Sequence, residues 1–238
     1  YGLYVIDEAN VESHGFGYKK ENSPAYKPEF DEMHMDRWVR MFERDKNYPS
    51  IVVWSLGNEA GDGPIFVEGY KWLKEQDSSR LVFYERTSER PLDKELVGID
   101  LETHTDFFGW MYFKMNDLRK FYLNKFPNRP FIWAEYSHAM GNSNGNLKDL
   151  WDMVYAERQM QGGFIWDFVD QGLAEFKDGK KYWAYGGDYA PSSYYNDSNF
   201  CMNGLVNPDR TPHPALNEVK HVYQDAKVSI LGNGDKIK

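Results

Sequence analysis

The feature that most constrains this fold is a regular alternation of short apolar runs with amphipathic stripes of helical spacing. The apolar runs, each a predicted buried strand, span residues 4–6, 51–56, 81–84, 107–112, 131–134 and 164–169. The stripes, with apolar residues three and four positions apart, lie at 35–42, 66–73, 118–122 and 147–154. Strand, helix and strand repeated in this way predict a parallel sheet with right-handed crossovers.

Two architectures fit this alternation, a doubly wound sheet and a (β/α)8 TIM barrel. No Gly-x-Gly-x-x-Gly motif follows the first strand, which argues against a dinucleotide-binding dehydrogenase. Polar residues follow several different strands, where barrels build their sites. They are Asp7, Glu8, Asn58, Glu59, Glu85, Tyr112, Glu135 and Asp167. We therefore predict an α/β fold of the TIM-barrel type, with six strands present and the first two missing before Tyr1.

Both ends of the sequence predict that it is cut from a longer protein. Residues 1–6 already have the pattern of a strand, and residues 227–231 predict a strand that opens a new domain. We interpret 1–226 as an N-terminally truncated barrel domain and 227–238 as the start of the following domain. The absence of a targeting signal at Tyr1 therefore carries little weight for the compartment.

Composition excludes some classes of function. The formal net charge of -9 argues against nucleic acid as a partner, and no stretch approaches the roughly 20 apolar residues of a membrane span. The single Cys201 excludes an internal disulfide framework and a cysteine-based zinc cluster, and it does not distinguish cytoplasm from periplasm. An aromatic share of 17% slightly favours a carbohydrate ligand, because aromatic rings pack against the apolar faces of sugars.

Glu59 and Glu135 each follow an apolar run, and two carboxylates placed alike suggest a working pair. Glu59 is a candidate general acid/base, with Asn58 beside it to bind a sugar hydroxyl; an equal alternative from spacing is that Glu59 caps the next helix. Glu135 is a candidate nucleophile, and carboxyls about 5 Å apart would give retention of anomeric configuration. Tyr112 is either a hydrogen-bond partner of that nucleophile or a buried structural tyrosine.

Glu12 and His14 are two positions apart, so both side chains of an extended loop could face one cation. Oxygen ligands with few nitrogens favour Mg²⁺ over zinc. On spacing alone, an ordinary solvated loop is the better interpretation of this pair.

Five segments together resemble the glycoside hydrolase family 2 β-galactosidases, of the long bacterial lactose-cleaving type. They are residues 7–15, 55–61, 135–144, 162–171 and 199–216, which cover nearly the whole chain in order. The most specific strings are Glu-Tyr-Ser-His-Ala-Met-Gly-Asn-Ser at 135–143 and Phe-Cys-Met-Asn-Gly-Leu-Val at 200–206. The resemblance implies a retaining β-galactosidase that removes terminal β-D-galactose from substrates such as lactose.

The resemblance also implies a role for each matching residue. Glu59 matches the acid/base and Glu135 the nucleophile, with Tyr112 beside it. His138 and Asn58 match sugar-binding and transition-state-stabilising positions, and Trp166 matches the platform under the galactose ring. Glu12, His14 and Glu59 match the ligands of an active-site Mg²⁺. Phe200, through its carbonyl, and Asn203, through its side chain, match a Na⁺ site, and Asn203 is also expected to bind substrate.

The resemblance places further β-sandwich domains on both sides of the barrel, so 227–238 is expected to begin one, and it implies that the parent enzyme is a homo-oligomer. A barrel short of two strands leaves open sheet edges, so we expect the isolated chain to be poorly stable and inactive. Alternatives are a β-glucuronidase or β-mannosidase, although no clear positive group for a uronic acid is near Glu135 in sequence. A catalytically inactive sugar-binding barrel is a further alternative, which the presence of both carboxylates argues against.

Overall fold

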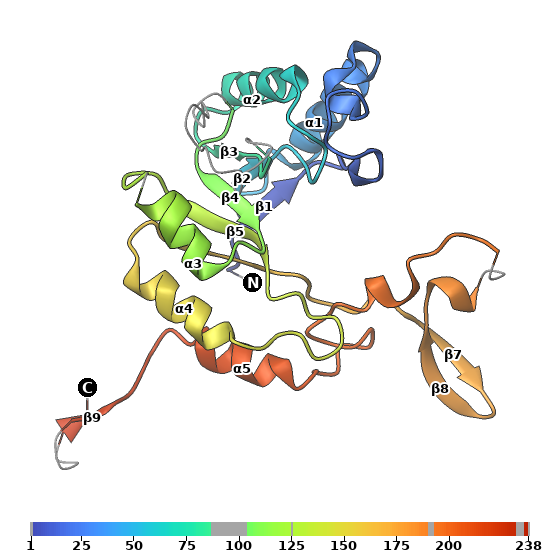
Figure 1. The fold of residues 1–238 in the computed structure, drawn as a ribbon, viewed down its shortest axis with the longest axis vertical. Coiled ribbons are helices and arrows are strands. Elements are labelled where there is room, and N and C mark those ends of the chain that lie inside the picture. Colours follow the sequence, from blue (N-terminus) through green and yellow to red (C-terminus); the bar gives the residue numbers. More distant parts are fainter. Residues whose placement is uncertain (1, 87–103, 125, 190–192, 232–235, 238) are drawn as a thin grey trace. The chain divides into compact units, whose positions relative to one another are not determined.

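A computed structural model describes residues 2–86, 104–124, 126–189, 193–231 and 236–237 (Figure 1). The chain forms two compact units. The first unit consists of Tyr1–Ala134 and Arg158–Gly163, and the second of Glu135–Glu157 and Phe164–Lys238. In the described part of the chain no helix is long and apolar enough to cross a membrane.

The first unit contains a parallel sheet with the strand order β1-β2-β3, which confirms the predicted strand–helix–strand pattern at the start of the chain. These strands are β1 (Val5–Glu8), β2 (Ile51–Ser55) and β3 (Leu81–Phe83), and both pairings are parallel. The crossovers are α1 (Asp31–Asp45) and α2 (Pro64–Gln76), which pack side by side (Figure 1). Because the strands are parallel, their carboxyl ends meet at one edge of the sheet.

Large aromatic residues form the core of the first unit, between the helices and the sheet. Trp38 of α1 and Phe66 of α2 are fully buried, with ring centroids 5.4 Å apart. The indole N–H of Trp38 donates to the carbonyl of Leu56 at 2.7 Å, which ties the helix to the end of β2. Gly69 lets α2 approach closely, because a Cβ there would lie 2.4 Å from the Trp38 ring.

A second sheet has the order β4-β5-β6. Its strands are β4 (Phe108–Met111), β5 (Phe131–Tyr136) and β6 (Met160–Ile165). The sixth predicted strand, 164–169, was wrong in position, because β6 begins earlier at the buried Met160. Two glycines break the apolar pattern of β6, whereas Phe164 and Phe168, which suggested the later strand, are 47% and 65% exposed.

Between β4 and β5 the predicted helical stripe at 118–122 forms only short helical pieces. These are α3 (Met115–Leu118) and a π-helical turn over Arg119–Leu123. Leu118 and Tyr122 are buried, so the stripe correctly identifies part of the buried face. The helical pieces are nevertheless shorter than the usual crossover helix of a barrel.

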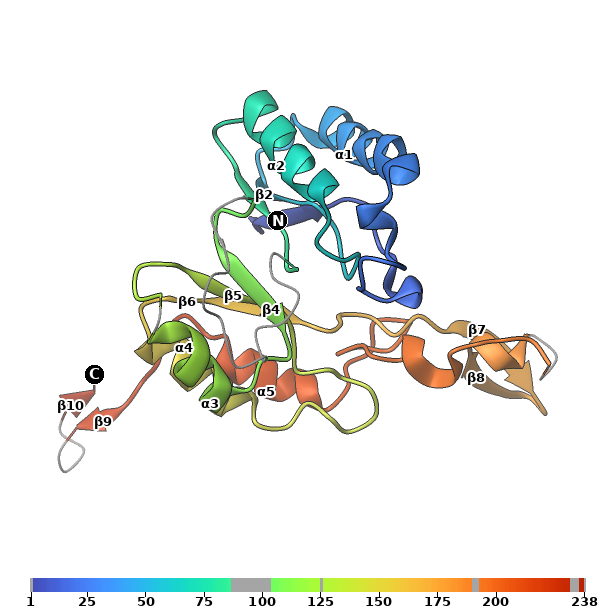
Figure 2. The same ribbon diagram turned by 45° about the horizontal axis from the view of Figure 1, so that its top comes forward.

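The second unit is built on α4 (Leu147–Ala156) and α5 (Ala215–Val222), which lie side by side (Figure 2). Aromatic side chains join them: the Trp151 and Tyr223 rings are 4.5 Å apart. Tyr136 at the end of β5 accepts a hydrogen bond from the Trp151 indole at 2.7 Å and is hydrogen-bonded to the Tyr223 hydroxyl. The predicted stripe 147–154 is therefore a packed helix, as expected.

An antiparallel hairpin of β7 (Leu173–Lys177) and β8 (Lys180–Ala184) extends from the second unit (Figure 2). Its turn is Asp178-Gly179, with φ angles of 50° and 73°. An Asp-Gly pair is a strong signal for a two-residue hairpin turn. The apolar runs did not reveal this hairpin because its strands are largely exposed and rich in charged residues.

Short elements complete the described structure. They are the 3₁₀ turns His14–Phe16, Pro24–Tyr26, Pro28–Phe30, Gly186–Asp188 and Ser198–Cys201, and the strands β9 (Ile230–Leu231) and β10 (Lys236–Ile237). β9 and β10 pair antiparallel within the predicted 227–238 segment, of which 232–235 and 238 lie outside the described residues. The assignment of that segment to a β-sandwich stays a prediction. The described strands form partial sheets and no closed barrel.

Candidate active site

Glu59 lies in the loop that follows β2, in a backbone conformation that few side chains adopt. Its φ is 43°, in the left-handed region, where a non-glycine residue is strained. The backbone N–H of Glu59 donates to Oε1 of Glu85 at 2.8 Å. Glu85 follows β3 and is 2% exposed, so a buried carboxylate holds the strained peptide in place. Glu59 therefore does not act as an ordinary helix cap, and α2 begins only at Pro64.

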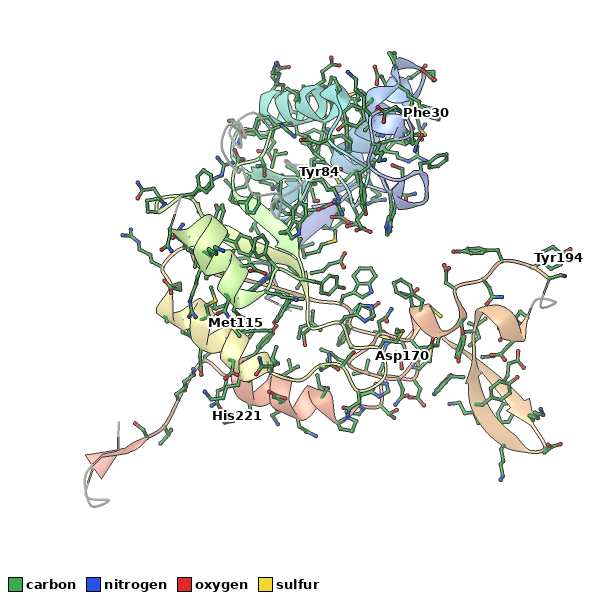
Figure 3. All side chains as sticks on the ribbon, viewed as in Figure 1. Phe30, Tyr84, Met115, Asp170, Tyr194 and His221 are labelled. Atoms are coloured by element: carbon green, nitrogen blue, oxygen red, sulfur yellow. The ribbon has the colours of Figure 1, made fainter. Side chains whose placement is uncertain are left out.

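The rest of this loop is held by buried hydroxyl groups and by close backbone packing. Tyr84 (Figure 3) donates to the carbonyl of Gly61 and accepts from the N–H of Ala60 at 3.3 Å. Gly57 and Gly63 leave no room for a side chain: a Cβ would lie 2.5 Å from the Val11 carbonyl oxygen and 1.8 Å from that of Ala25, respectively. The loop after β2 is thus packed against the segment that follows β1.

That packing brings Glu12 and Asn58 side by side, because the two residues form a parallel β-bridge. Asn58 donates its backbone N–H to the carbonyl of Val11 at 2.8 Å. His14 follows on the same segment, and its Nδ1 lies 2.9 Å from Oε2 of Glu59. The predicted neighbours of Glu59 therefore do assemble around it.

Glu12, His14 and Glu59 each offer one ligand atom, and these atoms all lie within 4.8 Å of one another. Glu12 and His14 are exposed, while the Glu59 side chain is 18% exposed. Two carboxylates and one imidazole at this spacing fit a divalent cation, and the oxygen-rich set fits Mg²⁺. Burial raises the pKa of the nearby Glu8 carboxyl, and the charge of Glu12 adds to this shift, while the hydrogen bond from Ser55 opposes it.

Two residues that the sequence did not single out complete the surroundings of Glu59. Its Oε1 accepts a hydrogen bond from the Tyr18 hydroxyl at 2.8 Å and another from Arg86 at 3.0 Å. Burial and the hydrogen bond to Glu59 raise the pKa of the Tyr18 hydroxyl, so it acts as a donor. Arg86 directly follows Glu85, one of the polar residues at the ends of predicted strands. This adjacency was the available sequence signal that Arg86 belongs to the site.

In the second unit, Glu135 lies in the last part of β5, before a tightly bonded loop. Ser137 has a φ of 51°, again in the left-handed region. Trp166 donates its backbone N–H to the Tyr136 carbonyl at 3.1 Å and accepts from Ala139 at 2.8 Å. These bonds hold the predicted sugar platform beside the loop that carries Glu135 and His138.

His138 lies beside two groups of the second unit. Its ring centroid is 5.7 Å from that of Phe200. Burial raises the pKa of the Asp167 carboxyl, while a hydrogen bond from Gln171 and the proximity of His138 act in the opposite direction. The sequence-predicted His138, Trp166 and Phe200 are therefore brought into one neighbourhood.

Asn203 is 2% exposed, and its Nδ2 donates to the carbonyl of Phe200. Its Oδ1 is buried and has no hydrogen-bond partner among the described residues. A buried amide oxygen without a partner is a ligand type that suits a hard cation such as Na⁺. Asp170 (Figure 3), which the sequence did not single out, accepts from the N–H of Gly204 at 2.7 Å and lies 2.8 Å from Nε2 of His213.

Residues 1–228 match the family described as glycosyl hydrolases family 2, TIM barrel domain. The chain belongs to glycosyl hydrolase family 2. A β-galactosidase of Photobacterium profundum is 45% identical over 97% of this chain and 22% of the relative. A β-galactosidase of Priestia megaterium is 46% identical over 95% of this chain and 21% of the relative. The chain thus spans only about a fifth of these relatives.

Solved family 2 structures have the same fold. A β-glucuronidase from Ruminococcus gnavus in complex with uronic deoxynojirimycin has a TM-score of 0.66 at 20% identity, over 94% of this chain and 40% of that one. A β-galacturonidase from Eisenbergiella tayi bound to galacturonate has a TM-score of 0.65 at 18% identity, over 95% and 42%. At such identities the likeness shows the fold alone, which is TIM-barrel-like.

The residues that the sequence singled out lie in both units, and each unit holds its own group of them. Glu12, His14, Asn58 and Glu59 assemble in the first unit. Glu135 belongs to the second unit, so the 5 Å separation of the two carboxyls stays a prediction. Tyr112, predicted as a partner of the nucleophile or a buried structural residue, follows β4 in the first unit. It is 44% exposed and has a φ of 50°, which argues against the buried structural interpretation.

Proposed function

We propose that this chain is the catalytic part of a retaining β-galactosidase that hydrolyses terminal non-reducing β-D-galactose residues, as in lactose. The observation that carries the proposal is the setting of Glu59: a strained backbone, held by a buried carboxylate, presents its side chain to Glu12 and His14. Strain of this kind is retained where the surroundings over-determine a functional geometry. The identity to β-galactosidases of 45% and 46% supports galactose as the sugar.

The proposed reaction is a double displacement. Glu135 attacks the anomeric carbon, and Glu59 donates a proton to the departing oxygen, so that a galactosyl-enzyme forms and the aglycone leaves. Glu59 then takes a proton from water, which attacks the anomeric carbon and releases Glu135 with net retention. His138 and Asn58 bind sugar hydroxyls, Trp166 packs against the galactose ring, and Tyr112 is assigned a hydrogen bond to the nucleophile.

Two cations are part of the proposal. Glu12, His14 and Glu59 would hold Mg²⁺, which supplies positive charge beside the acid/base when bound. Glu12, Glu59 and Glu85 contribute negative charge that Arg86 offsets only in part, which favours a divalent cation at this site. The Phe200 carbonyl and the Asn203 side chain would hold Na⁺ in the second unit.

A uronic acid is the main competing substrate class, because the structural neighbours include a β-galacturonidase and a β-glucuronidase. Those neighbours are only 16–18% identical to this chain, so they carry no argument on the sugar. Recognition of a uronic acid would need a cation that pairs with its carboxylate, and among the described residues Arg86 is already paired with Glu59. Homo-oligomerisation of the complete enzyme is proposed on the resemblance alone.

The test uses the longer protein of which, as we propose, this chain is a part. Hydrolysis is measured on the nitrophenyl β-glycosides of galactose, glucuronic acid, galacturonic acid and mannose. We expect turnover of the galactoside; a preference for either uronide would overturn the choice of sugar.

A Glu135→Gln variant tests the nucleophile. We expect kcat to fall about 10³-fold or more, while a non-hydrolysable thiogalactoside still binds. The matched control is Glu218→Gln on the exposed side of α5, which should keep normal turnover. An unchanged kcat in Glu135→Gln would refute the assignment of the nucleophile.

A further inference from the structure

Arg86 is a buried cation at the edge of the first-unit sheet. Its side chain is 10% exposed. The guanidinium carbon lies 3.7 Å from the ring centroid of Tyr18 and 5.1 Å from that of Trp110, so an aromatic face covers the charge. A guanidinium accommodates such stacking because it is planar and weakly hydrated, and it stays protonated. Burying this charge is costly without partners, so its contacts indicate its role.

Among the described residues, the two carboxylates that Arg86 contacts are Glu59 itself and Glu85, which holds the loop of Glu59 in place. The guanidinium donates to Oε1 of Glu59 at 3.0 Å, and its Nε lies 3.4 Å from Oε1 of Glu85. The same Glu85 oxygen accepts the backbone N–H of Glu59. Arg86 therefore lies beside the side chain of Glu59 and also beside the group that fixes its peptide.

The two oxygens of Glu59 have separate surroundings. Oε1 accepts from Tyr18 and from Arg86, whereas Oε2 faces Nδ1 of His14. Hydrogen bonds to charged groups are short and directional, so two donors on Oε1 fix the plane of the carboxylate. Tyr18 has a double role, because its hydroxyl bonds Oε1 while its ring carries the guanidinium.

We propose that Arg86, supported by the ring of Tyr18, is a positioning residue for Glu59. Arg86 holds Oε1 and so keeps Oε2 turned toward Glu12 and His14. The proposal rests on the proposed function, in which Glu59 is the acid/base. Arg86 itself needs no contact with substrate, and its effect on the reaction passes through the orientation of Glu59.

A residue that acts through the general acid has a kinetic signature that a purely structural residue lacks. The 2,4-dinitrophenolate of a dinitrophenyl galactoside leaves without being protonated. The methoxide of a methyl galactoside leaves only when Glu59 protonates its oxygen. A misplaced Glu59 therefore lowers kcat/KM for the methyl galactoside much more than for the dinitrophenyl galactoside. In the second step Glu59 is the base for both substrates, so for the dinitrophenyl galactoside kcat and KM should fall together.

The test compares Arg86→Met, Arg86→Lys and Tyr18→Phe in the complete protein. For Arg86→Met we expect kcat/KM to fall about 100-fold on the methyl galactoside and less than about 3-fold on the dinitrophenyl galactoside. Arg86→Lys should recover part of the loss because it restores the charge without the planar fork. Tyr18→Phe keeps the ring and removes one donor, so its loss should be smaller and of the same selectivity.

The matched control is Arg80→Met. Arg80 is also a largely buried arginine of the first unit, stacked 5.1 Å from the Trp54 ring and paired with Asp77 at 2.8 Å, in contacts away from the loop of Glu59. Its removal should lower thermal stability and leave the ratio of kcat/KM on the two substrates unchanged. Equal losses on both substrates in Arg86→Met would overturn the proposal. Failure of the unmodified protein to cleave any galactoside would instead refute the proposed function.

Discussion

The backbone N–H of Glu59 donates to Oε1 of Glu85 at 2.8 Å, so a buried acid after β3 fixes the residue that follows β2. This bond crosses between neighbouring parallel strands at the edge where their carboxyl ends meet. It holds a φ of 43° that a glutamate in an unsupported loop would leave. The orientation of Glu59 is therefore set by its peptide as well as by its side chain.

Glu85→Ala should release that peptide and misplace Glu59. A displacement of about 1 Å at a catalytic group can cost about 100-fold in rate, so we expect kcat to fall by about that factor in the complete protein. Steady-state kinetics on a nitrophenyl galactoside measures the loss. Glu75→Ala, on the exposed side of α2, serves as the control and should change kcat less than about 2-fold. Full activity of Glu85→Ala would show that the bond is dispensable.

Gly69→Ala should destabilise the first unit although alanine is the better helix former. The helix gains about 1 kcal/mol from the change, but the new Cβ would meet the fully buried Trp38 ring at 2.4 Å. Overpacking of a core costs about 1–3 kcal/mol, so we expect a net loss of stability in denaturant unfolding. Gly145→Ala, where a Cβ meets nothing within 4 Å, should be within about 0.5 kcal/mol of the unmodified protein.

Asp7→Asn should change how stability depends on pH. Burial, the hydrogen bond with Asp45 and the charge of Asp45 raise the pKa of Asp7 from 3.8 to about 6, while Arg44 opposes the shift. The folded chain thus keeps a proton that the unfolded chain has lost, and stability falls as pH rises from about 4 to about 6. The hydrogen bond from Arg44 lowers the pKa of Asp45, so Asp45 changes the stability of the chain only at more acidic pH.

Asp7→Asn replaces the titrating carboxyl with a neutral amide, so the loss of stability between about pH 4 and about pH 6 disappears. We expect a higher melting temperature than the unmodified protein at pH 7.5, and a difference that shrinks toward pH 4.5. Thermal unfolding followed at several pH values checks this expectation. A constant difference across that range would contradict the assignment of a raised pKa to Asp7.

Asp170→Ala should weaken the proposed Na⁺ site without touching its ligands. Asp170 is 6% exposed and accepts from Gly204, the residue next to Asn203. Loss of a group that orients a metal ligand typically lowers affinity about 10- to 100-fold, so the Na⁺ concentration for half-maximal activity should rise by about that factor. Asp152→Ala, which removes an exposed partner of Lys148 on α4, should leave the Na⁺ dependence unchanged.

The sequence pattern predicts those elements whose burial is regular. The strands at 51–56 and 81–84 and the helical stripes at 35–42 and 66–73 match β2, β3, α1 and α2 closely, because each buries one continuous apolar face. The hairpin of β7 and β8 is different, since its exposed strands carry no such face and only the Asp-Gly turn announces it.

The candidate site shows the same limit. Glu59, Glu12 and His14 could be singled out because strand ends and short motifs are local features of a sequence. Their grouping as one ligand set was predicted from the family resemblance, since spacing alone favoured a solvated loop for Glu12 and His14. For Arg86 the sequence offered only its place next to Glu85, and for Tyr18 it offered no signal, because their contact is a ring stacked on a guanidinium between two loops far apart in the chain. Asp170 was missed for a similar reason. Its place in the site depends on a hydrogen bond from the backbone N–H of Gly204, and no sequence motif around Asp170 indicates that bond.

The glycines at 57 and 63 have a consequence for motion. Each brings the backbone of the Glu59 loop against the backbone of the segment after β1, at Val11 and at Ala25. With no side chain between them to act as a compressible layer, neither loop can shift without carrying the other along. Glu12, His14 and Glu59 should therefore fluctuate as one body, so that thermal motion displaces the cluster as a whole while its internal spacing is kept.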